Sequence, residues 1–172
     1  MIVFTDAFTD DELFSDSFPQ KTEFGGFIIN VSSKMMKKDD DEDILYDRKT
    51  FDAMDNKPDN VIDVDQVVET FRLQELTSIA KIKDCVATIT PYLTALKKKI
   101  QTNKGEDALK SFNEELKKFL MDQVGKDFSN YKFYMGESMD TDNGMVVFQK
   151  YNDDGETTQL YFFADGLKQI KC

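Results

Sequence analysis

Apolar residues repeat with helical spacing through the middle third of the chain. Across residues 79–100 they recur three and four positions apart, and a second set across residues 109–124 does the same. Gly105, in the stretch QTNKGED between the two sets, favours a break because glycine is a poor helix former. The pattern predicts an antiparallel helical hairpin over residues 76–125.

Pro91 lies inside the first predicted helix, where a proline costs about 3 kcal/mol because it lacks a backbone N–H. The apolar repeat keeps its phase across this position, and Pro91 falls on the opposite side. We therefore expect one long helix kinked at Pro91, with two abutting helices as the alternative.

Aromatic and β-branched runs on both sides of the hairpin predict strands. Before it, residues 2–4, residues 24–31 and the pair Met35-Met36 have this character, with a turn expected at Ser32-Ser33. After it, the runs FSNYKFYMGE, GMVVFQKYN and TTQLYFFAD are separated by the turn signals DNG and NDDG. Strands, a helical pair and then a strand meander indicate one α+β domain over residues 1–172.

Residues 37–60, KKDDDEDILYDRKTFDAMDNKPDN, follow neither period and include an unbroken acidic run at residues 39–43. A segment of this length and character inside a compact domain is usually mobile or functional. We interpret residues 37–60 as a long flexible acidic loop.

Charge and composition exclude several classes of function. With 33 acidic and 22 basic side chains the net charge is −11, so the field of the protein repels phosphate and nucleic-acid binding is not expected. The chain has no histidine, which excludes Ser-His-Asp catalysis, and its two distant cysteines cannot form a Cys₄ zinc site. No phosphate-binding loop or membrane-length apolar run is present. We expect a cytoplasmic protein that is not an enzyme, has no resident cofactor and spans no membrane.

Four segments, in order along the chain, resemble one known family. The chain begins MIVFTDAFTDDELFSDSFP, carries DQVVETFRLQ before the hairpin and FYMGE at residues 133–137, and ends YFFADGLKQIKC. Together they resemble the translationally controlled tumour protein family over the whole chain. One feature departs from the family: its second signature, a Gly-Asn-Ser-Glu stretch, is missing from residues 37–60. The chain is therefore identified as a divergent member, and functions that the family assigns to that loop are not carried over.

The resemblance implies a twisted, mostly antiparallel β-sheet body, called a β-tent, with a projecting helical hairpin and a mobile acidic loop. It also implies a non-enzymatic, multi-partner binding protein that binds calcium weakly, associates with tubulin and microtubules, and acts in cell growth and survival. Because the family fold is similar to nucleotide-free chaperones of Rab GTPases, the alternative is a guanine-nucleotide-exchange accessory or regulator of a Ras-family small GTPase of the Rheb type. Similarity of fold is by itself a weak argument for activity.

For the GTPase function, the resemblance singles out a contact patch formed by Glu12, Leu73 and Glu137. A carboxylate there would act near the magnesium and phosphate site of the GTPase by competing for the cation or its lysine. From the residues alone, the alternatives are a solvated acidic turn for Glu12, a core position for Leu73 and a strand-end carboxylate that accepts turn amides for Glu137.

Acidic pairs in two predicted turns are candidate calcium ligands: Asp140, Asp142, Asp153 and Asp154. The first pair is nearest to an EF-hand loop, but Gly144 comes one position early and Tyr151 stands in place of the bidentate glutamate. Any calcium binding is expected to be weak, toward ~10⁻⁴–10⁻³ M, and acidic turns that attract divalent cations loosely are the alternative.

The predicted hairpin is the basic part of the chain, because residues 66–127 carry a net charge of +2 whereas residues 1–65 carry −10. Its candidate platform for an acidic partner consists of Lys97, Lys98, Lys99, Lys117 and Lys118. The resemblance implies tubulin as that partner, and its acidic tails would bind such a surface in a salt-sensitive way. A solvated helix face, with lysines that complement the helix macrodipole, is the alternative.

The two cysteines have different expected roles. Cys85 lies beside the helical seam and is expected to pack in the core. Cys172 ends the chain and is expected to be exposed; the resemblance implies a Cys172-linked homodimer under oxidising conditions, and an idle thiol is the alternative.

Overall fold

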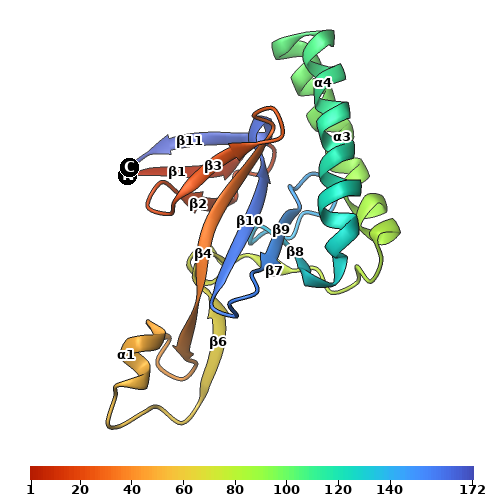
Figure 1. Ribbon diagram of the computed structural model, residues 1–172. Coiled ribbons are helices and arrows are strands. Elements are labelled where there is room, and N and C mark those ends of the chain that lie inside the picture. The colour runs from red at the N-terminus through yellow and green to blue at the C-terminus, as the bar shows by residue number, and fades with distance from the viewer.

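The protein is described by a computed structural model of residues 1–172, in which two antiparallel sheets and a helical hairpin form an α+β fold (Figure 1). The smaller sheet has the order β11–β1–β2, from β11 (Leu167–Lys171), β1 (Ile2–Asp6) and β2 (Glu12–Ser15). The larger sheet has the order β3–β4–β10–β9–β8–β7, and β5 and β6 pair with β4 off this path. Its strands are β3 (Gln20–Glu23), β4 (Ile28–Asp39), β5 (Ile44–Tyr46), β6 (Val61–Asp65), β7 (Gln74–Glu75), β8 (Tyr131–Met135), β9 (Val147–Tyr151) and β10 (Thr157–Phe163). The three strands predicted in the last third are confirmed.

β4 is one continuous strand of 12 residues, so the turn predicted at Ser32-Ser33 is wrong. Its first part pairs with β3 and β10, and the pairing passes to β6 from Met35 onward, which keeps the strand extended across the predicted break. Ser33 is buried, and its hydroxyl donates to Asp65 Oδ1 at 2.7 Å. A residue typical of turns therefore satisfies a buried carboxylate within a strand.

The segment 37–60, expected to be a loop, contains regular structure at the far end of β4. It includes β5 and the short helix α1 (Arg48–Asp52), and Figure 1 shows this part of the chain as an arm at the end of the larger sheet, remote from the smaller sheet and the hairpin. β5 has three residues and α1 has five, which is too short for either period to show in the sequence. The flexibility of this segment stays a prediction.

The helical hairpin is confirmed. It consists of α3 (Ile82–Lys104) and α4 (Glu106–Lys117), followed by the π-helical η1 (Lys118–Val124) and the 3₁₀-helical η2 (Gly125–Asn130). The break falls at Gly105, whose φ of 91° lies in the left-handed region that glycine adopts most readily. Pro91 is exposed within one unbroken helix, while Ile89 and Leu93 point into the core.

Aromatic contacts dock the hairpin onto the N-terminal part of the chain. The rings of Phe27 and Phe112 lie 5.4 Å apart between centroids, and those of Phe24 and Phe119 lie 5.3 Å apart, each pair edge to face. Such pairs contribute roughly 0.5–1.5 kcal/mol beyond the area that they bury. The hairpin projects beyond the sheets in Figure 1, but its base is part of the single core.

Asp65 is a buried carboxylate that connects three strands and one helix. It caps α2 (Gln66–Thr70) by accepting from the backbone amides of Val67 and Val68, at 2.9 and 3.3 Å. Its oxygens also accept from Ser33 in β4, from Gln149 Nε2 in β9 at 2.9 Å, and from the hydroxyl of Thr158 in β10. The charge is thus buried with five donors around it, which fixes α2 against the larger sheet.

The pairing of β1 with β11 brings the two ends of the chain together (Figure 1). The backbone amide of Cys172 donates to the carbonyl of Met1 at 2.8 Å, and the Cys172 side chain is exposed. Cys85 is fully buried, as expected, and burial raises the pKa of its thiol to about 12. None of the helices combines the length and apolar character that crossing a membrane requires.

Candidate functional site

The three segments that carry Glu12, Leu73 and Glu137 meet at one place on the surface. Ser138 Oγ, in the turn after β8, donates to Asp11 Oδ2 beside the start of β2 at 2.6 Å. Arg72, in the link between α2 and β7, places Nη1 3.4 Å from Glu137 Oε1. We name this surface the β2–β8 patch and define it by Asp11, Glu12, Arg72, Glu137 and Ser138.

The predicted contact residues differ in exposure within this patch. Glu12 and Glu137 are exposed, and 61% of the Glu137 side chain is accessible. Leu73 is only 5% exposed and belongs to the core cluster, so it supports the patch from beneath. Its backbone amide donates to the carbonyl of Val68 at 2.9 Å, which ties this link back onto α2.

Gly136 allows the two sides of the patch to approach closely. A Cβ atom at this position would lie 2.4 Å from Asp11 Oδ2 and 2.5 Å from Asp11 Cβ. Any side chain would therefore push the turn away from the start of β2. The glycine in FYMGE is visible in the sequence, but its partner is far away along the chain, so sequence patterns did not reveal the contact.

Backbone strain is concentrated around this patch. Five residues other than glycine have a positive φ, and three of them lie in or next to the patch: Arg72 at 56° within it, and Asp10 at 65° and Met139 at 52° beside it. Residues in this region cost on the order of 1–3 kcal/mol each and persist only where the surroundings fix them. Their concentration here supports a functional role for this surface.

Two of the candidate calcium ligands, Asp140 and Asp154, accept hydrogen bonds from backbone amides within their own turns. Asp140 Oδ1 accepts from the backbone amides of Asp142 and Asn143, and Asp154 Oδ1 accepts from those of Glu156 and Thr157. These bonds lower the pKa of both carboxyls; the largest cause is the Asn143 side chain for Asp140 and the Thr157 backbone amide for Asp154. Asp142 and Asp153 are exposed, and no three acidic or cysteine side chains are grouped to hold a metal ion. Weak calcium binding stays a prediction.

The hairpin lysines are not equivalent. Lys99 Nζ donates to the carbonyl of Asp165 at 2.7 Å and so helps to dock the hairpin, as does the ion pair of Lys104 with Asp165 Oδ1 at 2.7 Å. Lys118 pairs with Glu115 at 3.5 Å. The remaining members of the predicted platform form no ion pair: Lys97, Lys98 and Lys117.

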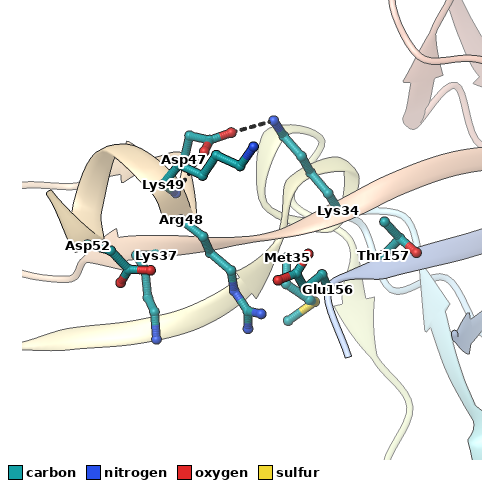
Figure 2. A pocket seen from close by; sticks show the side chains of 9 residues that line it. All are labelled: Lys34, Met35, Lys37, Asp47, Arg48, Lys49, Asp52, Glu156 and Thr157. Atoms are coloured by element: carbon teal, nitrogen blue, oxygen red, sulfur yellow. Dashed lines mark hydrogen bonds and ion pairs between the residues drawn. The ribbon is translucent and has the colours of Figure 1, made fainter. Parts of the chain in front are cut away.

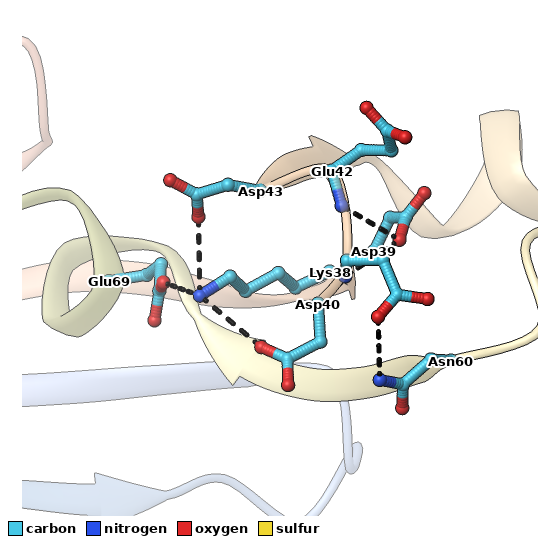
Figure 3. A network of polar contacts seen from close by, with 8 residues as sticks. Lys38, Asp39, Asp40, Glu42, Asp43, Asn60 and Glu69 are labelled. Carbon is cyan, nitrogen blue, oxygen red and sulfur yellow. Dashed lines mark hydrogen bonds and ion pairs between the residues drawn. The ribbon is translucent and has the colours of Figure 1, made fainter.

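The acidic run at residues 39–43 folds around a lysine (Figure 3). Lys38 Nζ lies 2.5 Å from Glu69, 3.3 Å from Asp43 and 3.7 Å from Asp40, and only 16% of its side chain is exposed. The hydrogen bond with Glu69 is the largest cause of the raised pKa of Lys38. Asp39 is buried and accepts from the amides of the following turn. Lys38 thus neutralises part of the negative charge of the acidic run.

A polar hollow of about 530 Å³, which the sequence did not predict, lies between α1, β4 and the start of β10 (Figure 2). Its charged lining residues are Lys34, Lys37, Asp47, Arg48, Lys49, Asp52 and Glu156. Lys34 pairs with Asp47 at 2.7 Å and Lys37 with Asp63 at 2.8 Å, and in each case the lysine hydrogen bond is the largest cause of the lowered pKa of the carboxyl. Arg48 donates to the carbonyl of Gly155 at 3.2 Å. The contacts of Asp47 and Arg48 attach α1 to the larger sheet, whereas the pair of Lys37 with Asp63 joins β4 to β6. Together these contacts already occupy most of the cations in the hollow.

Asp47→Ala is expected to loosen α1 without affecting the sheets, because Asp47 both pairs with Lys34 and caps this helix. The ¹H–¹⁵N heteronuclear NOE of residues 48–52 should fall at neutral pH, while that of β10 stays unchanged. Asp52→Ala, on the same helix but without an ion pair, is the matched control. Because the folded pKa of Asp47 is lowered, its contribution is complete above its usual pKa and is lost as the pH falls through the lowered value. Equal NOE values in both variants would contradict this role.

Comparison with known proteins identifies the family. The sequence model of the translationally controlled tumour protein family matches residues 1–168. Translationally-controlled tumor protein homologs from Gibberella zeae and Candida glabrata are each 34% identical over 173 and 172 residues, with 99% of this chain and 99% of each relative covered. The solved structure of the translationally controlled tumor-associated protein of Schizosaccharomyces pombe superposes with a TM-score of 0.75 at 29% identity, covering 100% of both chains.

Proposed function

The chain belongs to the translationally controlled tumour protein family, and we propose that it is a non-enzymatic cytoplasmic binding protein that uses the β2–β8 patch to contact a Ras-family small GTPase of the Rheb type. In this proposal it acts as an exchange accessory or regulator of that GTPase and is linked through it to cell growth and survival. The observation that carries the proposal is the geometry of the patch. Glu12 and Glu137 are both exposed, and the distant segments that carry them are joined by the contacts of Asp11 with Ser138 and of Arg72 with Glu137.

Carboxylates suit this task because nucleotide affinity in such GTPases depends on a magnesium ion and a phosphate-binding lysine. A carboxylate presented at that site competes for the cation or the lysine and weakens the hold on the nucleotide, with no covalent step. Rigid presentation matters, since a preorganised surface loses less conformational entropy on binding.

Replacing Glu12 by glutamine is expected to reduce stimulated nucleotide release from the GTPase about tenfold, because the amide keeps the shape of the side chain and loses its charge. The measurement is release of a fluorescent guanine nucleotide from a Rheb-type GTPase, with and without the protein. Glu106→Gln, an exposed carboxylate at the start of α4, is the control and should behave as the unmodified chain. Equal stimulation by Glu12→Gln and Glu106→Gln would remove Glu12 from the proposal.

Microtubule association is the second candidate function, favoured by the unpaired lysines on the projecting hairpin. Reversing Lys97, Lys98 and Lys117 to glutamate is expected to reduce co-sedimentation with microtubules severalfold at low salt, because tubulin tails are acidic. Lys99 is left intact, since it docks the hairpin. A triple reversal away from the hairpin, at Lys21, Lys49 and Lys171, controls for net charge. Equal losses in both triple variants would show that the hairpin is not the platform.

The proposal includes two further partners, calcium and a second copy of the chain. Calcium would bind weakly at the acidic turns around the half-buried Asp140 and the exposed Asp154, whose carboxylates already accept turn amides. A second copy of the chain would link through the exposed thiol of Cys172 under oxidising conditions.

A further inference from the structure

One hydroxyl group joins the two sides of the β2–β8 patch. Ser138 Oγ donates to Asp11 Oδ2 at 2.6 Å, and the same oxygen accepts from Thr9 Oγ1 at 3.2 Å. Ser138 and Asp11 are 127 positions apart in the sequence. Their hydrogen bond directly connects a side chain at the start of β2 with a side chain in the turn after β8. A hydrogen bond to a carboxylate is stronger than one between neutral groups, so it holds the patch together, and an exposed bond of this kind still opens locally.

Ser138 is also accessible in the way that the target serine of a protein kinase must be. It is exposed, in a turn closed by the Met139 amide on the carbonyl of Gly136 at 3.0 Å. Carboxylates surround it in the sequence, with Glu137 before it and Asp140 and Asp142 after it. An acid-directed protein kinase recognises a serine in such a setting through its own basic residues.

We infer that Ser138 is a phosphorylation site and that its modification opens the β2–β8 patch. In the step, Ser138 Oγ forms a bond to the γ-phosphorus of ATP, the bond from that phosphorus to the β–γ bridging oxygen breaks, ADP leaves, and the hydroxyl proton is released. The donor that held Asp11 is lost. The inference rests on the proposed function only for its effect on GTPase binding.

Two electrostatic changes follow from the added group. Phosphoserine carries about −1.5 to −2 charges at neutral pH and would stand against the Asp11 carboxylate, which repels it. Arg72 is the cation in the patch that can pair with the phosphate. Its side chain is 74% exposed, and its only ion pair is the 3.4 Å contact with Glu137. The phosphate competes with Glu137 for this guanidinium, because Arg–phosphate pairs are strong and often bidentate. The segments that carry Glu12 and Glu137 are then no longer held together by these contacts.

The test begins with the modification itself. The full chain is incubated with MgATP and an acid-directed Ser/Thr kinase such as casein kinase 2, and phosphate is located by mass spectrometry. We expect incorporation at Ser138, its absence in Ser138→Ala, and faster incorporation in Asp11→Asn, which weakens the bond that shields the hydroxyl. No incorporation at Ser138 would overturn the inference.

The consequence is read by ¹⁵N–¹H spectra of the phosphorylated chain and by GTPase affinity. Amide shifts are expected at Asp11, Glu12 and Arg72, and affinity should fall at least tenfold, as it should in Ser138→Glu. Ser129→Glu, at an exposed serine in η2, is the charge-matched control and should change affinity less than twofold. Unchanged amides at Asp11 and Glu12, or equal GTPase affinity before and after phosphorylation, would overturn the switch. If the amides shift while neither form binds the GTPase, the modification stands and the proposed function fails.

Discussion

Asp65→Ala is expected to lower the free energy of unfolding by about 4 kcal/mol, because it removes one acceptor from several buried donors at once. The donors left without their carboxylate are the Ser33 and Thr158 hydroxyls, the Gln149 amide and the first free N–H groups of α2. Each buried donor that loses its partner costs roughly 1–3 kcal/mol, and a lost N-cap costs about 1 kcal/mol. Part of this is recovered as the site relaxes and as water enters the space.

For a chain of this size the loss corresponds to a fall in melting temperature of about 10 °C. Thermal unfolding followed by circular dichroism measures it. Asp63→Ala is the matched control on the same strand: its carboxylate is half exposed and pairs with Lys37 and Arg48, so its loss should cost at most about 1 kcal/mol. Similar melting temperatures for the two variants would contradict the central structural role of Asp65.

Gly136→Ala is expected to abolish measurable GTPase binding while the sheets remain folded. The added Cβ would lie 2.5 Å from Asp11 Cβ, which is close to the backbone and cannot swing away as a flexible side-chain end does. The turn after β8 and the start of β2 must therefore separate, which moves the segment that carries Glu137 away from the segment that carries Glu12. Overpacking of this kind typically costs about 1–3 kcal/mol of stability.

The control for Gly136→Ala is Gly155→Ala, in the turn between β9 and β10. Gly155 has φ +69° with no atom near the added Cβ, so this change introduces backbone strain alone and should lower stability without weakening GTPase binding. Affinity measured by calorimetry beside a thermal melt separates the two effects. Full GTPase binding by Gly136→Ala would show that the close approach to Asp11 is not needed.

The two changes act on connected parts of the molecule. Asp65 caps α2, and the chain leaves α2 through Phe71 to reach Arg72 and Leu73. The buried network thus positions the arginine that contacts Glu137, and Leu73 anchors the same link in the core. Stability at Asp65 and geometry at the patch are therefore expected to be coupled.

Local pattern was sufficient to predict the elements with a long period and strong breaks. The hairpin, its break at Gly105 and the exposed side of Pro91 followed from the apolar repeat, because helix packing buries one stripe over many turns. The aromatic strands β8, β9 and β10 followed from their composition and the turns between them. Where elements are short, as in β5 and α1, no period can show.

The rest depended on contacts between distant residues. From the sequence, Ser33 is typical of a turn, but in the structure its hydroxyl donates to the buried Asp65 carboxylate. Lys99 is typical of a solvated helix face, but its Nζ donates to the backbone carbonyl of Asp165. In the patch, resemblance pointed to Glu12 and Glu137, whereas Asp11 and Ser138 emerged only when folding brought them to 2.6 Å. No spacing rule connects residues so far apart in sequence.

The most direct test of the account is a titration of the ¹⁵N-labelled chain with a nucleotide-free Rheb-type GTPase, followed by amide chemical shifts. Binding through the β2–β8 patch predicts shifts or broadening at residues 10–12, 72–73 and 136–138, with the hairpin amides unchanged. Unchanged amide signals throughout the spectrum, or changes confined to α3 and α4, would contradict the assignment of this patch as the GTPase-binding surface.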